Sequence, residues 1–337
     1  MTEHRLTLVF EDGISVAVAA DEVETVYQAA ARQNVPIQTD CREGACATCR
    51  ANCVAGRYEL GEYSEDALPE EEHAAGGVLA CQMRVRSDCV IEFPYPSTAI
   101  SVKSAKPTPV MMEEATQVAR DVFRLVIRPA SESPRFLPGQ YVNIIVPGTG
   151  VSRSYSFANA PGCDGLLEFY VRRLPQGAMS DWLAGAPERG TKTEIGPPMG
   201  QFFLRRSGSP MLMIAGGTGL APMLSMLRHL AAADERPPRI TLLYGTNVPE
   251  EMFADEELDA LARTLPLDIR RAAVAPAAGF EGVAGPVTEL LKPEMVTATT
   301  DSYLCGPPGM VQTAQKMLDQ IGQDKKRIFA EKFLPAA

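Results

Sequence analysis

The chain has 337 residues, of which 45% are hydrophobic and 22% are charged. This composition predicts a folded protein with two or three domains. The first ten residues, MTEHRLTLVF, lack the apolar run of a secretory signal. The most apolar stretch, residues 211–227, is interrupted by glycines and a proline, whereas a membrane helix needs roughly 20 unbroken apolar residues. We therefore expect a cytoplasmic protein with no membrane-spanning segment.

The net charge of −10 is unevenly distributed along the sequence. Residues 1–97 contain 17 acidic and 7 basic residues, whereas acidic and basic residues cancel in the remainder. Seven of the acids lie between Glu59 and His73, a run without Lys or Arg. Such a surface disfavours nucleic acid and anionic membranes as partners, and it favours a protein partner with complementary basic groups. The alternative is that the acidic run is only a solvated loop.

The first predicted domain covers residues 1–97. Residues 5–10 alternate as a strand does, a turn is expected at residues 11–13, and a second strand follows through residue 18. Asp21 and Glu24 resemble a capping box for a helix that extends to about Gln33. A hairpin, a helix and a cysteine-rich loop together predict a small α+β domain.

The remaining chain changes its pattern twice. Residues 98–109 lack periodicity and are expected to form a linker. Residues 110–206 contain short strand patterns with Pro-Gly turns, which predict an antiparallel β-barrel or sandwich. Residues 207–337 alternate between strands and helices (strands 211–215 and 240–245, helices 221–233 and 251–264). That alternation predicts an α/β domain with a doubly wound parallel sheet.

Six of the eight cysteines lie between residues 41 and 89. Cys41, Cys46 and Cys49 have the spacing C-x4-C-x2-C, and Cys81 follows after 31 intervening residues. Four thiolates at this spacing are typical of a [2Fe–2S] cluster. Structural zinc sites instead use paired C-x2-C units, and bacterial-type clusters use C-x2-C-x2-C-x3-C-P, so both alternatives fit less well. Cys53 and Cys89 are interpreted as small core residues.

The first domain resembles a plant-type ferredoxin, particularly in Cys41-Arg-Glu-Gly-Ala-Cys-Ala-Thr-Cys49. The resemblance implies a β-grasp fold that holds a [2Fe–2S] cluster. Small residues in the loop allow its backbone to approach the cluster and to donate N–H groups to sulfur.

A second group of candidate binding residues follows the predicted strand at residues 139–147. Arg153 and Tyr155 are expected on one face of the next strand, with Ser154 and Ser156 on the other. Farther on, Gly177-Ala-Met-Ser180 opens a predicted helix, whose first N–H groups can bind phosphate. Either motif alone is also found on ordinary surfaces.

Together these motifs resemble the flavin domain of the ferredoxin–NADP⁺ reductase superfamily. The resemblance implies that FAD is bound with its pyrophosphate on Arg153, its isoalloxazine ring on Tyr155 and its N5 atom on Ser156. It also implies that residues 177–180, including Gly177, Met179 and Ser180, bind the second phosphate.

The α/β domain contains two loops expected at the carboxyl ends of parallel strands, where such sheets bind ligands. The first is Gly216-Gly-Thr-Gly-Leu-Ala-Pro222, and the second lies within Tyr303-Leu-Cys-Gly-Pro-Pro-Gly-Met310. A purely structural glycine turn is the alternative for the first loop. Both loops resemble the nicotinamide-binding pair of the same superfamily. The residues thereby implied in cofactor binding are Gly217, Thr218, Gly219, Cys305, Gly306 and Pro307, and Cys305 and Ser156 are the predicted catalytic residues.

The C-terminal Ala330-Glu-Lys-Phe333 resembles the end of reductases whose terminal aromatic residue covers the flavin. The alternative for Phe333 is a surface aromatic at a frayed end. His4, His73 and His229 lie outside every motif, and no chemistry is assigned to them.

The order of ferredoxin, flavin and nicotinamide domains resembles the single-chain reductases of ring-hydroxylating dioxygenases, of the benzoate and toluate type. The resemblance implies transfer of a hydride from NADH to FAD, and of single electrons through the cluster to an oxygenase component. Reductases of soluble diiron monooxygenases or of deoxysugar biosynthesis share this domain order and stay open as alternatives. A non-catalytic redox sensor fits less well, because a sensor needs no hydride donor. NADH is expected over NADPH, since residues 246–251 offer no Arg or Lys to a 2′-phosphate.

Overall fold

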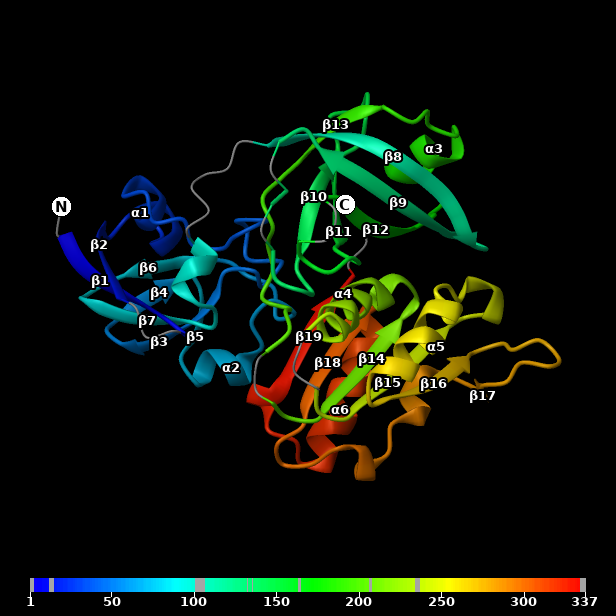
Figure 1. Ribbon diagram of the computed structural model, residues 1–337. Helices are drawn as coiled ribbons and strands as arrows, with labels where there is room; N and C mark the ends of the chain where they lie inside the picture. Colours follow the sequence, from blue (N-terminus) through cyan, green and yellow to red (C-terminus); the bar gives the residue numbers. More distant parts are fainter. Residues whose placement is uncertain are drawn as a thin grey trace. The chain divides into compact units, whose positions relative to one another are not determined.

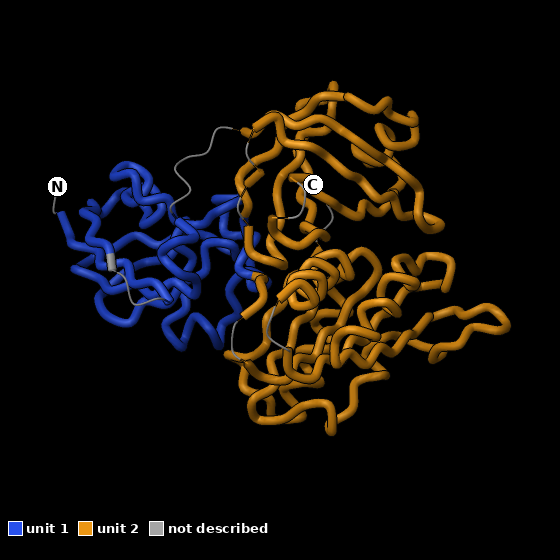
Figure 2. Tube along the Cα trace, viewed as in Figure 1, with its two compact units in different colours: residues 1–106, 199–201 blue, residues 107–198, 202–337 orange. Residues whose placement is uncertain are grey.

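The structure is a computed structural model, and it describes residues 3–11, 15–100, 107–131, 133–134, 136–162, 165–205, 208–233 and 237–333. The chain divides into two compact units (Figure 2), residues 1–106 with 199–201 and residues 107–198 with 202–337. The predicted turn at residues 12–13, Cys163, and residues 101–106 of the predicted linker lie outside the described residues.

The first unit is built on a mixed five-stranded sheet in the order β2-β1-β7-β3-β5. β1 and β2 form an antiparallel hairpin, β1 pairs in parallel with β7, and β3 is antiparallel to both β7 and β5. A second small sheet pairs β4 with β6. Side chains that alternate inward along β1 and β7 form the core. Its elements are β1 (Glu3–Phe10), β2 (Ser15–Asp21), α1 (Val26–Arg32), β3 (Arg50–Ala55), β4 (Tyr58–Leu60), α2 (Glu70–Ala74), β5 (Gly77–Leu79), β6 (Met83–Val85), β7 (Cys89–Phe93) and η1 (Ser97–Ile100).

The predicted capping box was placed one turn too early. Asp21 and Glu24 do exchange hydrogen bonds, but this happens in the turn before the helix. The helix α1 begins after Thr25, whose hydroxyl accepts from the Gln28 N–H while the Gln28 side chain accepts from the Thr25 N–H. Both pairs have the three-residue spacing of a capping box, so spacing alone could not distinguish them.

The second unit contains two sheets, drawn from cyan to green and from yellow-green to red in Figure 1. The first sheet has six strands in the order β11-β10-β13-β8-β9-β12, and every pairing in it is antiparallel. Its core consists mainly of Val, Ile, Leu and Phe side chains that alternate inward along these strands. The elements are β8 (Thr108–Ala119), β9 (Val122–Pro129), β10 (Tyr141–Ile145), β11 (Ser152–Ser156), β12 (Leu167–Arg172), α3 (Ala178–Ala184) and β13 (Lys192–Ile195).

The second sheet of this unit is fully parallel, in the order β17-β16-β15-β14-β18-β19. One face packs on α4 and α5, and the other packs on α6, as a doubly wound fold requires. The elements are β14 (Met211–Gly216), η2 (Gly217–Gly219), α4 (Leu220–Ala231), β15 (Ile240–Thr246), η3 (Pro249–Glu251), α5 (Asp255–Thr264), β16 (Leu267–Ala273), β17 (Val283–Ala284), η4 (Val287–Leu290), η5 (Pro293–Met295), β18 (Asp301–Gly306), α6 (Pro308–Ile321), η6 (Lys325–Arg327) and β19 (Ile328–Lys332). The helix predicted at residues 251–264 begins four residues later, because Pro249–Glu251 forms a separate 3₁₀ turn.

A part-buried ion-pair network joins the two sheets of this unit. Arg228 of α4 donates to Glu168 of β12, to Glu257 of α5 and to the Ala158 carbonyl oxygen. Arg124 of β9 holds the other oxygen of Glu168 at 2.9 Å. Because Glu168 is 8% exposed, its charge depends on both guanidinium groups. In the part of the chain that the structure describes, no helix is long and apolar enough to cross a bilayer.

Candidate redox centres

The four predicted cluster ligands lie in and beside one loop of the first unit. Cys41, Cys46 and Cys49 precede β3, and Cys81 follows β5, the neighbour of β3 in the sheet. The pairing of β3 with β5 therefore brings the fourth cysteine to the first three. Gly44 adopts a φ of +78°, and a Cβ there would lie 2.8 Å from the Glu62 carbonyl oxygen, so this position requires glycine.

The sulfur atoms of this loop accept backbone hydrogen bonds, as predicted from its small residues. The Cys41 sulfur lies 3.5 Å from the Glu43 nitrogen and 3.4 Å from the Ala45 nitrogen, and the Cys46 sulfur lies 3.4 Å from the Cys41 nitrogen. Such N–H groups stabilise the negative charge of thiolates bound to iron.

The thiols are arranged in two hydrogen-bonded pairs, Cys41 with Cys46 and Cys49 with Cys81. Among the residues that the structure describes, no three His, Cys, Asp or Glu side chains surround a single point as one metal ion would require. Two pairs of thiolates are what the two irons of a [2Fe–2S] cluster need, one pair for each iron. The donor set therefore fits this cluster better than it fits a mononuclear zinc site.

The predicted flavin-binding side chains lie on β11, which pairs with β10 in antiparallel register. Tyr155 is partly buried against the core of the antiparallel sheet, and burial raises the pKa of its hydroxyl. The Arg153 guanidinium contacts only its neighbour's carbonyl oxygen among the hydrogen bonds of the described residues. A partly exposed cation and an adjacent aromatic ring suit a pyrophosphate and a flat ring system.

Ser156 and Cys305 come together around a third residue that the sequence motifs did not single out. Ser156 ends β11, Cys305 lies on β18, and Glu331 lies opposite Cys305 on β19. The Ser156 hydroxyl donates to the Glu331 carboxylate at 3.2 Å, and the same oxygen lies 4.0 Å from the Cys305 sulfur. Burial raises the pKa of Glu331 to about 8 and raises the pKa of the Cys305 thiol. Glu331 as a whole residue is only partly buried, but its carboxyl group points inward to these partners, and the carboxyl group determines the pKa.

Residues 177–180 form the start of α3. Gly177 is the N-cap without a side-chain hydrogen bond, and the Ser180 hydroxyl accepts from the Leu174 N–H at 2.8 Å. The Met179 side chain is 3% exposed and packs in the core of the antiparallel sheet. These two side chains therefore point inward, and a phosphate here would be bound by backbone N–H groups.

The two glycine loops of the parallel sheet pack against each other. A Cβ at Gly219 would lie 2.2 Å from the Cys305 carbonyl oxygen, and one at Gly306 would lie 3.0 Å from the Gly216 backbone. Close contact between the loops thus requires glycine at positions 219 and 306. Gly217 differs, because it has a φ of +54° and open space around it. Gly217 is the position where a ligand can approach the backbone, whereas the Thr218 side chain beside it is buried.

Phe333 lies just after β19, and its N–H donates to the Gly306 carbonyl oxygen at 2.9 Å. Its ring is partly buried against the core of the parallel sheet. The terminal aromatic residue is therefore held beside the second glycine loop rather than at a frayed end.

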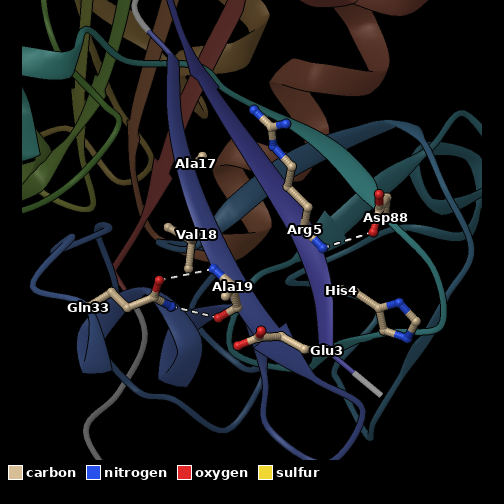
Figure 3. Close-up of a pocket in the computed structure, with 8 residues that line it drawn as sticks. All are labelled: Glu3, His4, Arg5, Ala17, Val18, Ala19, Gln33 and Asp88. Atoms are coloured by element: carbon tan, nitrogen blue, oxygen red, sulfur yellow. Dashed lines mark hydrogen bonds between the residues drawn. The ribbon is translucent and has the colours of Figure 1, made fainter.

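An open pocket of about 510 Å³ lies away from all of these residues, on β1 and β2 of the first unit (Figure 3). Two of the polar side chains that line it are already paired: Asp88 accepts from the Arg5 N–H, and the Gln33 amide bonds both the N–H and the carbonyl oxygen of Ala19. None of the predicted site residues lines this pocket.

Three family models match the chain in the predicted order. Residues 9–86 match the 2Fe-2S iron-sulfur cluster binding domain, residues 109–204 the oxidoreductase FAD-binding domain, and residues 213–316 the oxidoreductase NAD-binding domain. Over 337 residues the chain is 37% identical to the toluate 1,2-dioxygenase electron transfer component of Pseudomonas putida, with 99% of each chain covered. The chain belongs to this family of electron transfer components.

Two further relatives show how broad the family is. Methane monooxygenase component C of Methylosinus trichosporium is 38% identical over 301 residues, which is 87% of each chain. The crystal structure of a cytochrome P450 reductase from Amycolatopsis is 28% identical with a TM-score of 0.73, and the match covers 98% of this chain and 100% of that one. The predictions of a ferredoxin domain, an FAD domain and an NAD domain in one oxidoreductase are therefore confirmed for this electron transfer component.

Glu331 is the residue that the motifs missed. The sequence did contain a signal, since Glu331 belongs to the last strand of a parallel sheet and lies near its carboxyl end, where ligands bind. What the sequence could not show is that β19 pairs with β18 in a register that places Glu331 opposite Cys305.

Proposed function

We propose that this electron transfer component takes a hydride from NADH to FAD and passes single electrons through its [2Fe–2S] cluster to an oxygenase component in the cytoplasm. The oxygenase we propose is an aromatic-ring-hydroxylating dioxygenase of the benzoate type. The observation that carries the proposal is the full-length match to a toluate 1,2-dioxygenase component, which spans all three domains in the same order.

The cofactors divide the chemistry between them: the nicotinamide supplies a hydride, the flavin takes two electrons and releases them singly, and the cluster accepts one at a time. The residues of the chain position these groups. Ser156 would hold the flavin at N5, and Cys305 would lie beside the nicotinamide. Their contacts with Glu331 support this assignment, because two groups that must exchange a hydride have to approach within contact distance.

The remaining roles follow from the positions of the residues. Arg153 would bind the pyrophosphate, Tyr155 would pack on the isoalloxazine ring, and the start of α3 would bind the second phosphate through its N–H groups. Gly217, with open space around it, would allow the nicotinamide cofactor to approach the backbone. Phe333 would cover the flavin from the end of β19.

The experiment that tests the proposal is an anaerobic titration of the purified protein with NADH, monitored by visible absorption. We expect bleaching of both the flavin and the cluster, and then reoxidation when an aromatic-ring-hydroxylating dioxygenase component is added. Protein that keeps its colour with excess NADH would contradict the electron path.

A second candidate function is reduction of a soluble monooxygenase, which is favoured by the 38% identity to methane monooxygenase component C. Adding a diiron hydroxylase component to the NADH-reduced protein distinguishes the two. Faster reoxidation by the hydroxylase than by the dioxygenase would assign the chain to the monooxygenase group.

A further inference from the structure

Two cysteines outside the cluster loop lie together in the first unit. Cys53 is on β3 and Cys89 begins β7, its antiparallel neighbour. Cys53 is opposite Ile91, so Cys89 is its diagonal neighbour on the same face of the sheet. The Cys89 thiol lies close enough to donate a hydrogen bond to the Cys53 sulfur. The sequence interpretation of both as core residues therefore holds for Cys89, which is 2% exposed, but not for Cys53, which is partly exposed.

The backbone around this pair is arranged to bring the sulfur atoms close. The register of β3 shifts by one residue between Cys53 and Ala55, which bends the strand beside β7. Gly56 then adopts a φ of +109°, and a Cβ at this position would lie 2.4 Å from the Cys89 sulfur. Any larger residue there would displace the Cys89 thiol, so the glycine keeps the space for it.

The two thiols differ in burial and in chemistry. The residue before Cys89, Asp88, accepts from the Arg5 N–H at 2.9 Å (Figure 3), and the Cys89 thiol itself contacts the carbonyl oxygens of Arg57 and Ser87. The hydrogen bond from Cys89 lowers the pKa of the Cys53 thiol and raises that of Cys89. Cys53 is thus the accessible thiol that ionises first, and Cys89 is the buried partner.

From this geometry we propose that Cys53 and Cys89 form a second redox site, a dithiol that a hydroperoxide oxidises to a disulfide between β3 and β7. In the first step the Cys53 thiolate attacks the peroxide, so that an S–O bond forms, the O–O bond breaks and hydroxide leaves. In the second step the Cys89 sulfur, which gives its proton to the hydroxide, attacks the Cys53 sulfur, so that the S–S bond forms and hydroxide leaves. The proton from the original Cys53 thiol completes the second water. Two thiols and one hydrogen peroxide therefore give one disulfide and two waters.

The disulfide would cross-link β3 to β7, and β3 begins one residue after the proposed ligand Cys49. Diagonal neighbours on an antiparallel pair lie about 7–8 Å apart between Cα atoms, which is just beyond the range that a disulfide spans without backbone movement. Closing the bond therefore draws β3 toward β7, and the bulge in β3 is the place where the strand can yield.

The test uses the intact protein with its cluster and flavin, treated with increasing hydrogen peroxide and then alkylated. Trypsin separates the two cysteines cleanly, because residues 51–57 contain Cys53 alone and residues 87–103 contain Cys89 alone. We expect mass spectrometry to find these two peptides joined, and to find them separate after reduction. Visible absorption, followed in parallel, defines the peroxide range in which the cluster stays intact.

Two variants test the order of the steps. In Cys89→Ala we expect loss of the joined peptide and accumulation of a dimedone adduct on Cys53, since the sulfenic acid has no partner. In Cys53→Ser we expect loss of the joined peptide with Cys89 unmodified. Separate, unmodified peptides from the wild-type protein throughout the range in which the cluster is intact would overturn the proposal. So would a bridge from Cys53 to a cysteine of the cluster loop.

Discussion

The hydroxyl of Ser156 donates to the carboxylate of Glu331 although 175 residues separate the two in the sequence. The contact joins the last residue of β11 in the antiparallel sheet to β19 in the parallel sheet. It places a carboxyl group with a raised pKa where we propose that flavin and nicotinamide meet.

The raised pKa of Glu331 predicts a pH-dependent stability. The folded carboxyl group has a pKa of about 8 against 4.5 for an ordinary glutamate, so it keeps a proton that the unfolded chain has lost. Its contribution to the free energy of unfolding is therefore complete below the unfolded-state pKa, and it is lost as the pH rises through about 8. The loss is at most about 1.4 kcal/mol for each pH unit between these values.

The measurement is chemical denaturation of the flavin-loaded wild type and of Glu331→Gln between pH 5 and 9. The amide does not titrate, so we expect the variant to gain stability relative to the wild type across this range. Glu294→Gln, at an exposed position in η5, is the matched control. Its curve of unfolding free energy against pH should stay parallel to that of the wild type. If the Glu331→Gln and wild-type curves were also parallel, the raised pKa would be wrong.

Replacing a proposed cluster ligand should separate the two halves of the electron path. In Cys46→Ser we expect the cluster to be lost while NADH still reduces ferricyanide, because the flavin can reduce ferricyanide directly. Transfer to the oxygenase component should collapse. Cys53→Ser is the control, since Cys53 also lies in the first unit but pairs with Cys89 and is not a proposed cluster ligand. This variant should keep the cluster spectrum. Full oxygenase-coupled activity in Cys46→Ser would refute the ligand assignment.

The preference for NADH should depend on Glu250 rather than on Glu251. The Glu251 carboxylate is already engaged, since it accepts from the Asn247 N–H at 3.1 Å and lies 3.4 Å from the Arg172 guanidinium. Glu250 is exposed and follows the carboxyl end of β15, so its charge would repel a 2′-phosphate.

The wild type should therefore have the larger kcat/KM for NADH, and Glu250→Arg should shift the ratio toward NADPH by about tenfold, or about 1.4 kcal/mol. Steady-state kinetics with ferricyanide as electron acceptor measures the ratio of kcat/KM for NADH to kcat/KM for NADPH in the wild type and in the variant. Glu294→Arg is the control. Because η5 precedes β18, Glu294 lies toward the amino ends of the parallel strands, whereas Glu250 follows a carboxyl end. A wild type that prefers NADPH would contradict the assignment.

The acidic run at residues 59–73 should guide the oxygenase component. Not all of its acids are available, since Glu59 is paired with Arg86 at 2.7 Å and Glu72 with Arg50 at 2.6 Å. Reversing Glu72 would disturb Arg50, which also holds the Ala67 carbonyl oxygen. Glu65 and Glu70 are exposed and suit a charge reversal better.

In Glu65→Lys/Glu70→Lys we expect a higher KM for the oxygenase at low salt and a weaker dependence on ionic strength, with ferricyanide reduction unchanged. The control is Glu3→Lys/Glu92→Lys, which makes the same change of charge at exposed positions on β1 and β7. If the two variants support oxygenase-coupled turnover equally well, the acidic run is only a solvated loop.

The ion-pair network between the two sheets of the second unit should contribute strongly to stability. Arg228→Met leaves Glu168 with Arg124 alone, at a cost of about 3 kcal/mol in the free energy of unfolding. Arg270→Met removes an exposed pair with Asp268 and should cost less than about 1 kcal/mol. Urea denaturation compares the two variants. Equal losses in the free energy of unfolding would show that the network stabilises the protein no more than an exposed ion pair does.

The sequence was most informative where chemistry depends on local spacing. The C-x4-C-x2-C loop, the β11 motif and the two glycine loops are each contained in fewer than ten residues, and their strands and helices were predicted within a few residues. The fourth cysteine could be proposed from the family pattern, but its approach to the loop depends on the pairing of β3 with β5.

What the sequence could not show depends on register between distant strands. Glu331 meets Ser156 only because β19 pairs with β18, and Cys53 meets Cys89 because β3 pairs with β7 in a register that places Cys53 opposite Ile91. The glycines of the two loops illustrate a further limit. Their spacing predicted approach to a phosphate, whereas Gly219 and Gly306 are required by contact with another backbone segment.

The contact of Gly219 with the Cys305 carbonyl oxygen has a consequence for how the protein is made. The two loops close only after β18 has paired in parallel with β14, which lies about 90 residues earlier in the chain. A nascent chain that has reached α5 possesses the first glycine loop but not its partner. Under the proposed assignment of both loops to the nicotinamide cofactor, that cofactor cannot act as a template for the early folding of this domain, and it can stabilise the domain only after the long-range strand pairing is complete.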